Sequence, residues 1–416
     1  MTNIVKLPQY LWYEAKDVEF PLPDSWQVTV HNIAGYNRPA MKAEEIKTAV
    51  TSPIGMPPLR ELAKDRKEVV IIFDDMTRGT QVSEIVPFIL EELTEAGVTD
   101  DRIRFIAAVA NHQAMDRISM VKKLGEDIVA RFPVYNHCPF MNCTYIGTTS
   151  YGTRAEINSE VMYCDLKIGI GQIVPHPQYG FSGGGKIIIP GVASYDTVVA
   201  HHGEIHEAWK HEQRKLGLSL TRVVEDSPIN TDAQEIAKLA GLDMIINCTA
   251  NRWGETVAIF AGAFEPTYQE AAKEARSHYI TPNTGDNDIV IANACYKAAE
   301  FSIGWTNALP AVNSQGGDIV MIINSPSGQV VHYLFDSFGK TISGSIPRSV
   351  TVPPHIKNVI IYTEYPEVKV LDRFTDPNKV LLTSDWKQVI QTLEKSHGNG
   401  AKVAVYPNAD IVYFSD

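Results

Sequence analysis

The sequence is poor in basic charge and has no long apolar run. Of its 416 residues, 37 are Lys or Arg and 49 are Asp or Glu, giving a formal net charge of −12. Proteins that bind nucleic acids normally carry a basic face, so this balance argues against a nucleic-acid partner. No apolar run reaches the roughly 18 residues that a transmembrane helix needs, so no membrane partner is expected.

Cysteine is also scarce. The chain has 5 cysteines, a small and odd number, which is typical of reduced thiols and not of a disulfide framework. Cys138 and Cys143 have a weak metal-ligand spacing, but no second pair lies near them in the sequence. Residues 1–17 lack an apolar stretch behind basic residues, so no signal peptide is expected. These features predict a cytoplasmic protein.

The length and the alternation of patterns indicate the fold class. A chain this long exceeds what one core usually supports, so more than one domain is expected. Strand-like apolar runs alternate with helical patterns, which is typical of parallel sheets covered on both faces. The polar, turn-rich segment 279–286 is a boundary. We therefore expect two α/β domains with mostly parallel sheets, residues 1–280 and 281–416, and an active site in the cleft between them.

The most informative segment runs from Pro175 to Lys186 and reads PHPQYGFSGGGK. A glycine run lets backbone N–H groups approach an anion, and the neighbouring lysine can hold a phosphate or react through its amine. His176 and His202 flank that lysine, and imidazoles can ligate metals or move protons. Ile187 stands where a nucleotide hydrolase places Ser or Thr on Mg²⁺, which disfavours a conventional ATPase. Phosphate binding by the backbone of residues 182–185 remains an expectation.

Two further motifs follow expected strands. The turn Asp74–Gly79 follows the strand Val69–Phe73, and His112 follows the strand Ile103–Val109. Ligands of open α/β sheets bind beyond the carboxyl ends of strands. Arg78 suits bidentate capture of a carboxylate or phosphate, although a helix cap with a surface arginine is the simpler interpretation of that turn. The placement of His112 makes it a candidate general acid or base.

Later motifs are less specific. His202 and His206 are four residues apart on an expected helix, Thr197–Lys210, a spacing that can hold a divalent ion. For His206 and the charged residues after it, a solvated helix surface is the preferred interpretation. Lys297 lies one turn from Glu300 on an expected helix, Tyr296–Leu309, so the pair is either an exposed ion pair or a contact to an anionic substrate.

Taken together and in this order, these residues resemble the nickel-dependent lactate racemase family. The family pattern joins an Asp-x-x-Thr-Arg-type turn, a strand-end histidine, a His-(nine residues)-Lys segment and a His-His pair. The matching positions here are Asp75–Arg78, His112, His176–Lys186 and His201-His202. The likeness runs from Phe73 to His202, and residues 315–318 extend it weakly.

The resemblance implies an isomerase, a racemase or epimerase that inverts C2 of a 2-hydroxy acid by reversible hydride transfer. Members of the family carry a nickel-pincer nucleotide, a pyridinium-3-thioamide-5-thiocarboxylate mononucleotide with Ni, which cofactor-synthesis proteins of the host make. The first domain would carry the cofactor and the catalytic motifs, and the second would close the active site. By resemblance the roles are covalent attachment at Lys186, nickel ligation by His202, acid/base catalysis by His112 and His176, substrate binding by Arg78 and Lys297, and cofactor binding by Asp75, Thr77, Ser182, Gly183 and Gly184.

Several alternatives stay open at this point. Gly79 and Gly185 stand where the family commonly has proline and arginine, so the substrate is lactate, a larger 2-hydroxy acid or a sugar acid. A metal-dependent hydrolase or lyase would instead use the cluster His201, His202 and His206. A non-catalytic nucleotide- or anion-binding protein is the third interpretation. The sequence leaves the oligomeric state open, a homo-oligomer included.

Overall fold

The chain folds into two compact units in a computed structural model, which describes residues 3–215, 227–346 and 349–414. One unit comprises residues 37–278 and 332–334, and the other comprises residues 1–36, 279–331 and 335–416. The division between His278 and Tyr279 lies next to the boundary expected at residue 280. The first 36 residues nevertheless cluster with the C-terminal part, because the strand Gln27–Val30 pairs in parallel with Lys402–Val405.

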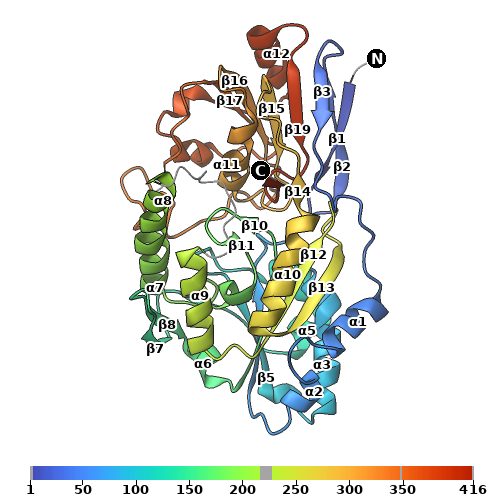
Figure 1. Cartoon of the computed structure of the whole chain (residues 1–416), viewed down its shortest axis with the longest axis vertical. Helices are drawn as coiled ribbons and strands as arrows, with labels where there is room; N and C mark the ends of the chain where they lie inside the picture. The colour runs from blue at the N-terminus through green and yellow to red at the C-terminus, as the bar shows by residue number, and fades with distance from the viewer. Residues whose placement is uncertain (1–2, 216–226, 347–348, 415–416) are drawn as a thin grey trace. The chain divides into compact units, whose positions relative to one another are not determined.

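The unit formed by residues 37–278 and 332–334, the larger unit, is built on a six-stranded sheet (Figure 1). Every pairing in it is parallel except the antiparallel pairing of the edge strand Thr256–Ala263 with Met244–Ala250. The strand order is β13 (Thr256–Ala263), β12 (Met244–Ala250), β9 (Leu166–Gln172), β4 (Val69–Asp74), β5 (Ile103–Ala108) and β6 (Val134–Asn136). All residues of β4, β9 and β12 are buried, as is typical of the central strands of a sheet covered on both faces.

Helices cover this sheet. In α3 (Val82–Glu95) the side chains of Ile85, Ile89 and Leu93 recur at helical spacing and are fully buried against the strands. Figure 1 shows α10 (Phe264–His278) lying along β12 and β13, which it contacts. The other helices are α1 (Ala43–Thr51), α2 (Leu59–Leu62), α4 (Arg117–Leu124), α5 (Glu126–Arg131), α6 (Ser159–Tyr163), α7 (Tyr195–Val199), α8 (His206–Lys215) and α9 (Pro228–Leu239).

The chain between β9 and α9 carries most of the sequence motifs. Two short strands, β10 (Pro175–His176) and β11 (Gly180–Phe181), form a hairpin ahead of a 3-10 turn at Gly184–Ile187. A second hairpin pairs β7 (Cys143–Thr148) with β8 (Arg154–Asn158). The expected helix Thr197–Lys210 is interrupted, because a π-helical turn at Ala200–Ile205 separates α7 from α8.

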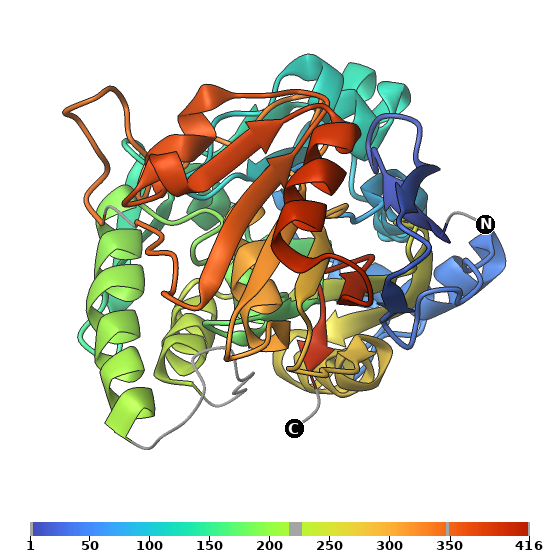
Figure 2. The same ribbon diagram turned by 90° about the horizontal axis from the view of Figure 1, so that it is seen from above.

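The other unit, the smaller unit, has a six-stranded sheet that is parallel throughout. Its strand order is β18 (Val380–Thr383), β17 (Ile356–Tyr362), β16 (Gly317–Ile322), β15 (Ile289–Asn293), β19 (Lys402–Tyr406) and β3 (Gln27–Val30). The helix α12 (Trp386–His397) contacts β17 and β18 (Figure 2), and α11 (Phe301–Ala308) contacts β15 and β16. The remaining strands are β1 (Asn3–Gln9) with β2 (Lys16–Leu22), and β14 (Ile280–Thr281) with β20 (Tyr413–Phe414).

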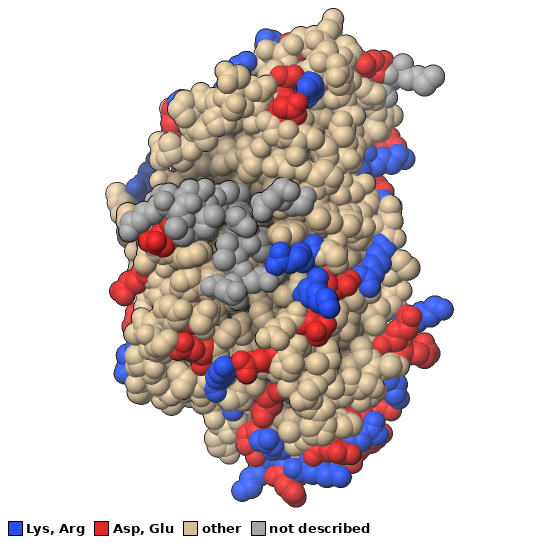
Figure 3. All heavy atoms as spheres, viewed as in Figure 1, with Lys and Arg blue, Asp and Glu red and all other residues tan. Residues whose placement is uncertain are grey.

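The expected α/β class with mostly parallel sheets is therefore confirmed. Within the described ranges, no helix is both long and apolar enough to cross a membrane. Acidic and basic side chains are interspersed on the face shown in Figure 3 and do not form a basic field there. In the larger unit acidic and basic side chains also pair, as Lys47 does with Glu91 at 2.7 Å.

Candidate functional site

The first polar cluster lies where β4 and β5 end, at the same edge of the larger unit's sheet. Asp75 directly follows β4, and His112 lies in the loop after β5. His112 Nδ1 is 2.6 Å from Asp75 Oδ2, and both side chains are buried. Because Nδ1 faces a carboxylate, it carries the ring proton, and Nε2 is the nitrogen left to exchange protons.

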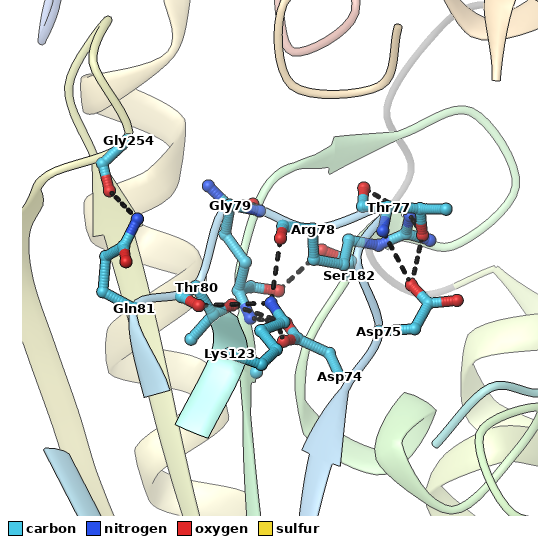
Figure 4. Close-up of polar contacts among 12 residues, drawn as sticks. Asp74, Asp75, Thr77, Arg78, Gly79, Thr80, Gln81, Lys123, Ser182 and Gly254 are labelled. Carbon is cyan, nitrogen blue, oxygen red and sulfur yellow. Dashed lines mark hydrogen bonds and ion pairs between the residues drawn. The ribbon is translucent and has the colours of Figure 1, made fainter. Parts of the chain in front are cut away.

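Asp75 organises the turn that follows it. Its Oδ1 accepts the backbone N–H of Thr77 at 3.0 Å and the Thr77 hydroxyl at 2.5 Å, and Arg78 Nη1 donates to that hydroxyl at 2.7 Å (Figure 4). Burial alone would raise the pKa of Asp75. The charge and hydrogen bond of His112, the Arg78 guanidinium and Thr77 outweigh it and hold the pKa well below the usual range. Asp75 is therefore ionised at neutral pH.

A buried lysine supports this turn from α4. Lys123 is fully buried, its Nζ lies 2.8 Å from Asp74 Oδ1, and it donates to the carbonyls of Arg78 and Thr80 (Figure 4). Burial lowers the pKa of Lys123, and the Asp74 carboxylate counteracts that effect. The sequence gives no sign of the role of Lys123, because nothing local marks a helix lysine as buried.

The second polar cluster surrounds Tyr179, whose side chain is fully buried. Lys186 Nζ lies 3.7 Å from the centroid of the phenol ring, and the His176 ring centroid lies 5.2 Å from it. The Tyr179 hydroxyl is 2.7 Å from His201 Nε2 and 3.4 Å from His202 Nε2. Three candidate residues of the sequence motifs, His176, Lys186 and His202, thus meet around Tyr179, for which the sequence predicted no role.

The contacts of His201 do not agree with the metal-ligand role that the hydrolase interpretation gives it. Its Nδ1 lies 2.5 Å from Asp232 Oδ2 and its Nε2 faces Tyr179, so both ring nitrogens are engaged. In the part of the chain that the structure describes, no three His, Cys, Asp or Glu side chains could together hold a metal ion. His206 is buried, against the expectation of a solvated surface. The cluster proposed for a hydrolase or lyase is therefore wrong as a three-ligand metal site.

The glycine run is packed closely against neighbouring parts of the protein. The Gly184 N–H donates to Asn247 Oδ1 at 3.1 Å, and the Ser182 N–H donates to the Val174 carbonyl at 2.8 Å. A Cβ on Gly184, whose φ is +54°, would lie 2.6 Å from a ring atom of Tyr268. Protein acceptors therefore use the N–H groups of Ser182 and Gly184, and phosphate binding by the backbone of residues 182–185 stays a prediction.

Gln172, at the end of β9, links the two clusters. Its Oε1 accepts the Gly79 N–H at 2.9 Å, its carbonyl accepts the Ser182 hydroxyl at 2.9 Å, and its own N–H donates to Asp74 Oδ2 at 2.9 Å. Since β9, β4 and β5 are neighbours in the sheet, all the motifs from Asp74 to Lys186 emerge at one edge.

A second histidine, His332, belongs to the first cluster. Residues His332–Leu334 belong to the larger unit, and His332 forms an antiparallel bridge with His112. The two imidazole centroids are 5.0 Å apart, and the Tyr333 N–H donates to the Asn111 carbonyl at 2.8 Å. The sequence offered no signal for His332, which lies in no motif and far along the chain from β5.

Lys297 belongs to the smaller unit, whereas the residues of both clusters belong to the larger unit. It is buried, and its backbone N–H donates to Asp410 Oδ2 at 2.5 Å. Burial raises the pKa of Asp410 to about 6, although Lys297 opposes this rise. The expected helix from Tyr296 begins only at Phe301, so the interpretation of Lys297 as an exposed residue of that helix is wrong.

The sequence is similar to a known protein family and to two characterised enzymes. Residues 13–214 match the family described as the lactate racemase N-terminal domain. The chain is 29% identical over 413 residues to a lactate racemase of Thermoanaerobacterium thermosaccharolyticum, covering 94% of this chain and 93% of that one. It is 28% identical over 404 residues to a lactate racemase of Lactiplantibacillus plantarum, covering 91% of this chain and 92% of the relative.

Solved structures agree on the fold. The lactate racemase apoprotein from Thermoanaerobacterium thermosaccharolyticum superposes with a TM-score of 0.74 at 22% identity, with 100% of both chains covered. A crystal structure of a protein from Thermotoga maritima gives a TM-score of 0.65 at 17% identity, covering 91% of this chain and 100% of that one. The resemblance inferred from the sequence motifs is confirmed. The relatives are named racemases, and racemases are isomerases, the enzyme class that the sequence predicted.

Proposed function

Since this chain carries a lactate racemase N-terminal domain and is related to lactate racemases over nearly its whole length, we propose that it is a racemase or epimerase that inverts C2 of a 2-hydroxy acid. The observation that carries the proposal is the grouping of His176, Lys186 and His202 around Tyr179, at the sheet edge that also holds the Asp75–His112 pair. Lactate, a larger 2-hydroxy acid and a sugar acid all have the hydroxyl and carboxylate that such a site would bind.

The residues fit a nickel-pincer nucleotide tethered to the protein. The Lys186 amine would be the attachment point, and the His202 imidazole beside it would be the protein's nickel ligand. A single protein ligand agrees with the engagement of His201 by Asp232 and Tyr179. When bound, the cofactor would accept hydride from C2 and return it. This matters because acid/base groups alone supply only about 10²–10⁴-fold, too little to ionise so weak a carbon acid.

His112 would transfer the proton of the substrate hydroxyl. Its Nδ1 is held by Asp75, so Nε2 is directed to the substrate and the tautomer is set. The ionised carboxylate would stabilise the imidazolium that forms when His112 takes the proton. Asp75, Thr77 and Arg78 form one hydrogen-bonded turn, so the residues proposed to bind the cofactor and the substrate carboxylate are positioned together.

His176 would perform the same task for the opposite enantiomer. The backbone N–H of Gln178 donates to His176 Nδ1 at 3.2 Å, which leaves Nε2 as the nitrogen for proton transfer. Two histidines are needed because the hydroxyl of one enantiomer points away from the base that serves the other. Arg78 would bind the substrate carboxylate bidentately. Lys297 remains our candidate for a second substrate contact, because a buried ammonium favours an anionic neighbour.

The test uses protein produced together with the cofactor-synthesis proteins of a competent host. Single enantiomers of lactate, longer 2-hydroxy acids and sugar acids are incubated with it, and the products are resolved by chiral chromatography. We expect one class to interconvert, and intact mass to show an adduct on Lys186. Replacing His112 or His176 by Asn should abolish interconversion and leave the adduct in place.

Near-normal turnover in either histidine variant would reject the two-base scheme. Adduct-bearing protein that binds hydroxy acids but inverts none of them would favour the non-catalytic binding protein instead.

A further inference from the structure

We propose that Tyr179 is a positioning residue for the Lys186 amine, and that a buried chain of hydrogen bonds through His201 and Asp232 sets the plane of its ring. The inference rests on the proposed function, which makes Lys186 the attachment point of a cofactor. It concerns the state before attachment, when Lys186 carries an unmodified amine.

The hydrogen bonds that link Tyr179, His201 and Asp232 run in one direction. His201 Nδ1 donates to the Asp232 carboxylate at 2.5 Å, so His201 Nε2 accepts the Tyr179 hydroxyl proton at 2.7 Å. Asp232 is itself fixed, because the hydroxyls of Thr149 and Thr153 donate to it at 2.5 and 2.9 Å. Asp232, His201 and Tyr179 are each 0% exposed, so breaking one link would leave a buried polar group without its partner.

The π-helical turn brings two consecutive histidines to the same phenol. In an α-helix with 3.6 residues per turn, neighbouring side chains point about 100° apart. Here the rings of His201 and His202 are 5.1 Å apart, and both lie within 5.8 Å of the Tyr179 ring. π-helical turns are rare and occur often at functional sites. Tyr179 is thereby held from the same turn that presents the proposed nickel ligand.

The face of the ring receives the lysine. Lys186 Nζ lies 3.7 Å from the ring centroid, well inside the roughly 6 Å over which an ammonium is attracted to an aromatic face. An unrestrained lysine side chain samples many rotamers, and ordering it costs conformational entropy. Contact with a fixed ring selects the rotamers that keep the amine on the face of Tyr179, whose hydroxyl lies 3.4 Å from His202 Nε2. The ring is fixed by its hydroxyl, so a phenylalanine would fill the space without providing the same restraint.

The apo-protein allows a direct geometric test. Lysine labelled with ¹³C at Cε is incorporated into the full chain, and the Lys186 cross-peak is assigned from its loss in Lys186→Arg. Protons above an aromatic face are shifted upfield, so we expect the Lys186 Hε resonance upfield of the other lysines. Tyr179→Leu should move it to the ordinary lysine position. Tyr179→Phe, His201→Asn and Asp232→Asn should each reduce the upfield shift, because the ring remains but is less restrained.

His137 provides a matched control. It is also a buried histidine of the larger unit, and it bonds the Ala193 carbonyl at 2.8 Å through Nε2. His137→Asn should leave the Lys186 resonance in place, with a loss of thermal stability comparable to that of His201→Asn. As a second measurement, intact mass after loading should show several-fold less adduct in Tyr179→Leu than in the wild type.

An ordinary lysine shift in the wild type, or an unchanged shift in both His201→Asn and Asp232→Asn, would overturn the proposal. A Lys186 shift that falls equally in His137→Asn would also overturn it, since general loosening would then explain the effect. If the shifts behave as expected but wild-type Lys186 never acquires an adduct, the proposed function fails and the positioning role stands.

Discussion

His112 contacts the carboxylate of Asp75 and the imidazole of His332, and both would influence the proton transfer proposed for it. Asp75 is the stronger influence, because it is ionised and 2.6 Å from the ring nitrogen, whereas His332 touches His112 through its ring. Asp75 was found from the sequence through its place behind an apolar strand. His332 was not, because no local pattern accompanies it.

Asp75→Asn should lower kcat by about 10- to 100-fold, the usual cost of removing a hydrogen-bonded partner of a functional group. The amide is the same size but cannot stabilise an imidazolium by charge. Turnover is measured by chiral chromatography of the preferred hydroxy acid. The adduct on Lys186 should remain, which separates loss of acid/base function from loss of cofactor, and an unchanged kcat would contradict the role given to Asp75.

His137 makes a pH-dependent contribution to stability. Burial lowers the pKa of His137 to about 4, although its bond to the Ala193 carbonyl opposes the shift. The unfolded chain has a histidine pKa of about 6.5, so between pH 6.5 and 4 the unfolded state takes up a proton that the folded state does not. Stability therefore falls as the pH falls through this window, by at most about 3 kcal/mol.

Urea unfolding of the wild type and His137→Gln at pH 7 and pH 4.5 checks this effect. The variant should be less stable than the wild type at pH 7, and the difference between the two proteins should shrink at pH 4.5. Other buried histidines titrate equally in both proteins, so they cancel in the comparison. A difference that is constant with pH would show that His137 is not held neutral.

Among the elements, the interrupted helix after α7 is the clearest departure from expectation. The residues of Thr197–Lys210 favour one continuous helix, and the structure contains α7, a π-helical turn and α8. The interruption follows from tertiary hydrogen bonds, since His201 bonds Asp232 on α9 and Tyr179 ahead of the glycine run. Helical propensity describes only local preferences, so it cannot predict this turn.

The 3-10 turn that carries Lys186 depends on close packing at Gly184. Gly184→Ala should destabilise the protein by more than the roughly 1–2 kcal/mol that an alanine at positive φ costs, because the new Cβ would also lie 2.6 Å from the Tyr268 ring. Gly97→Ala is the matched control, since Gly97 has a φ of +84° and a Cβ added there would meet no atom within 4 Å. Equal losses in chemical denaturation would show that packing against Tyr268 contributes nothing.

For the whole molecule, the placement of His332–Leu334 in the larger unit is the least local feature of the fold. Leu334 is fully buried there. Leu334→Ala should cost about 2–5 kcal/mol, the usual range for emptying a buried leucine site. Hydrogen exchange should increase in the peptide around Asn111, because the Tyr333 N–H bonds its carbonyl. Ile342→Ala, at a side chain that is 64% exposed in the same long loop, should change neither quantity.

Local pattern was sufficient for much of this protein. The apolar runs of β4, β5 and β9 and the polar residues directly after them were evident in the sequence, because a parallel strand must be apolar along its length and presents its ligands at its carboxyl end. The same reasoning selected Asp75, His112, His176, Lys186 and His202. It also supported the expected α/β class.

Tertiary structure decided the rest. It buried Lys123 beneath the Asp75 turn, paired the Gly184 N–H with Asn247, and brought Asp232, His201 and Tyr179 into one chain of hydrogen bonds. It also placed His332 against His112 and the first 36 residues with the C-terminal part of the chain. Each of these depends on contacts between segments far apart in sequence, and the free energy of such contacts comes from burial and pairing that no local spacing encodes.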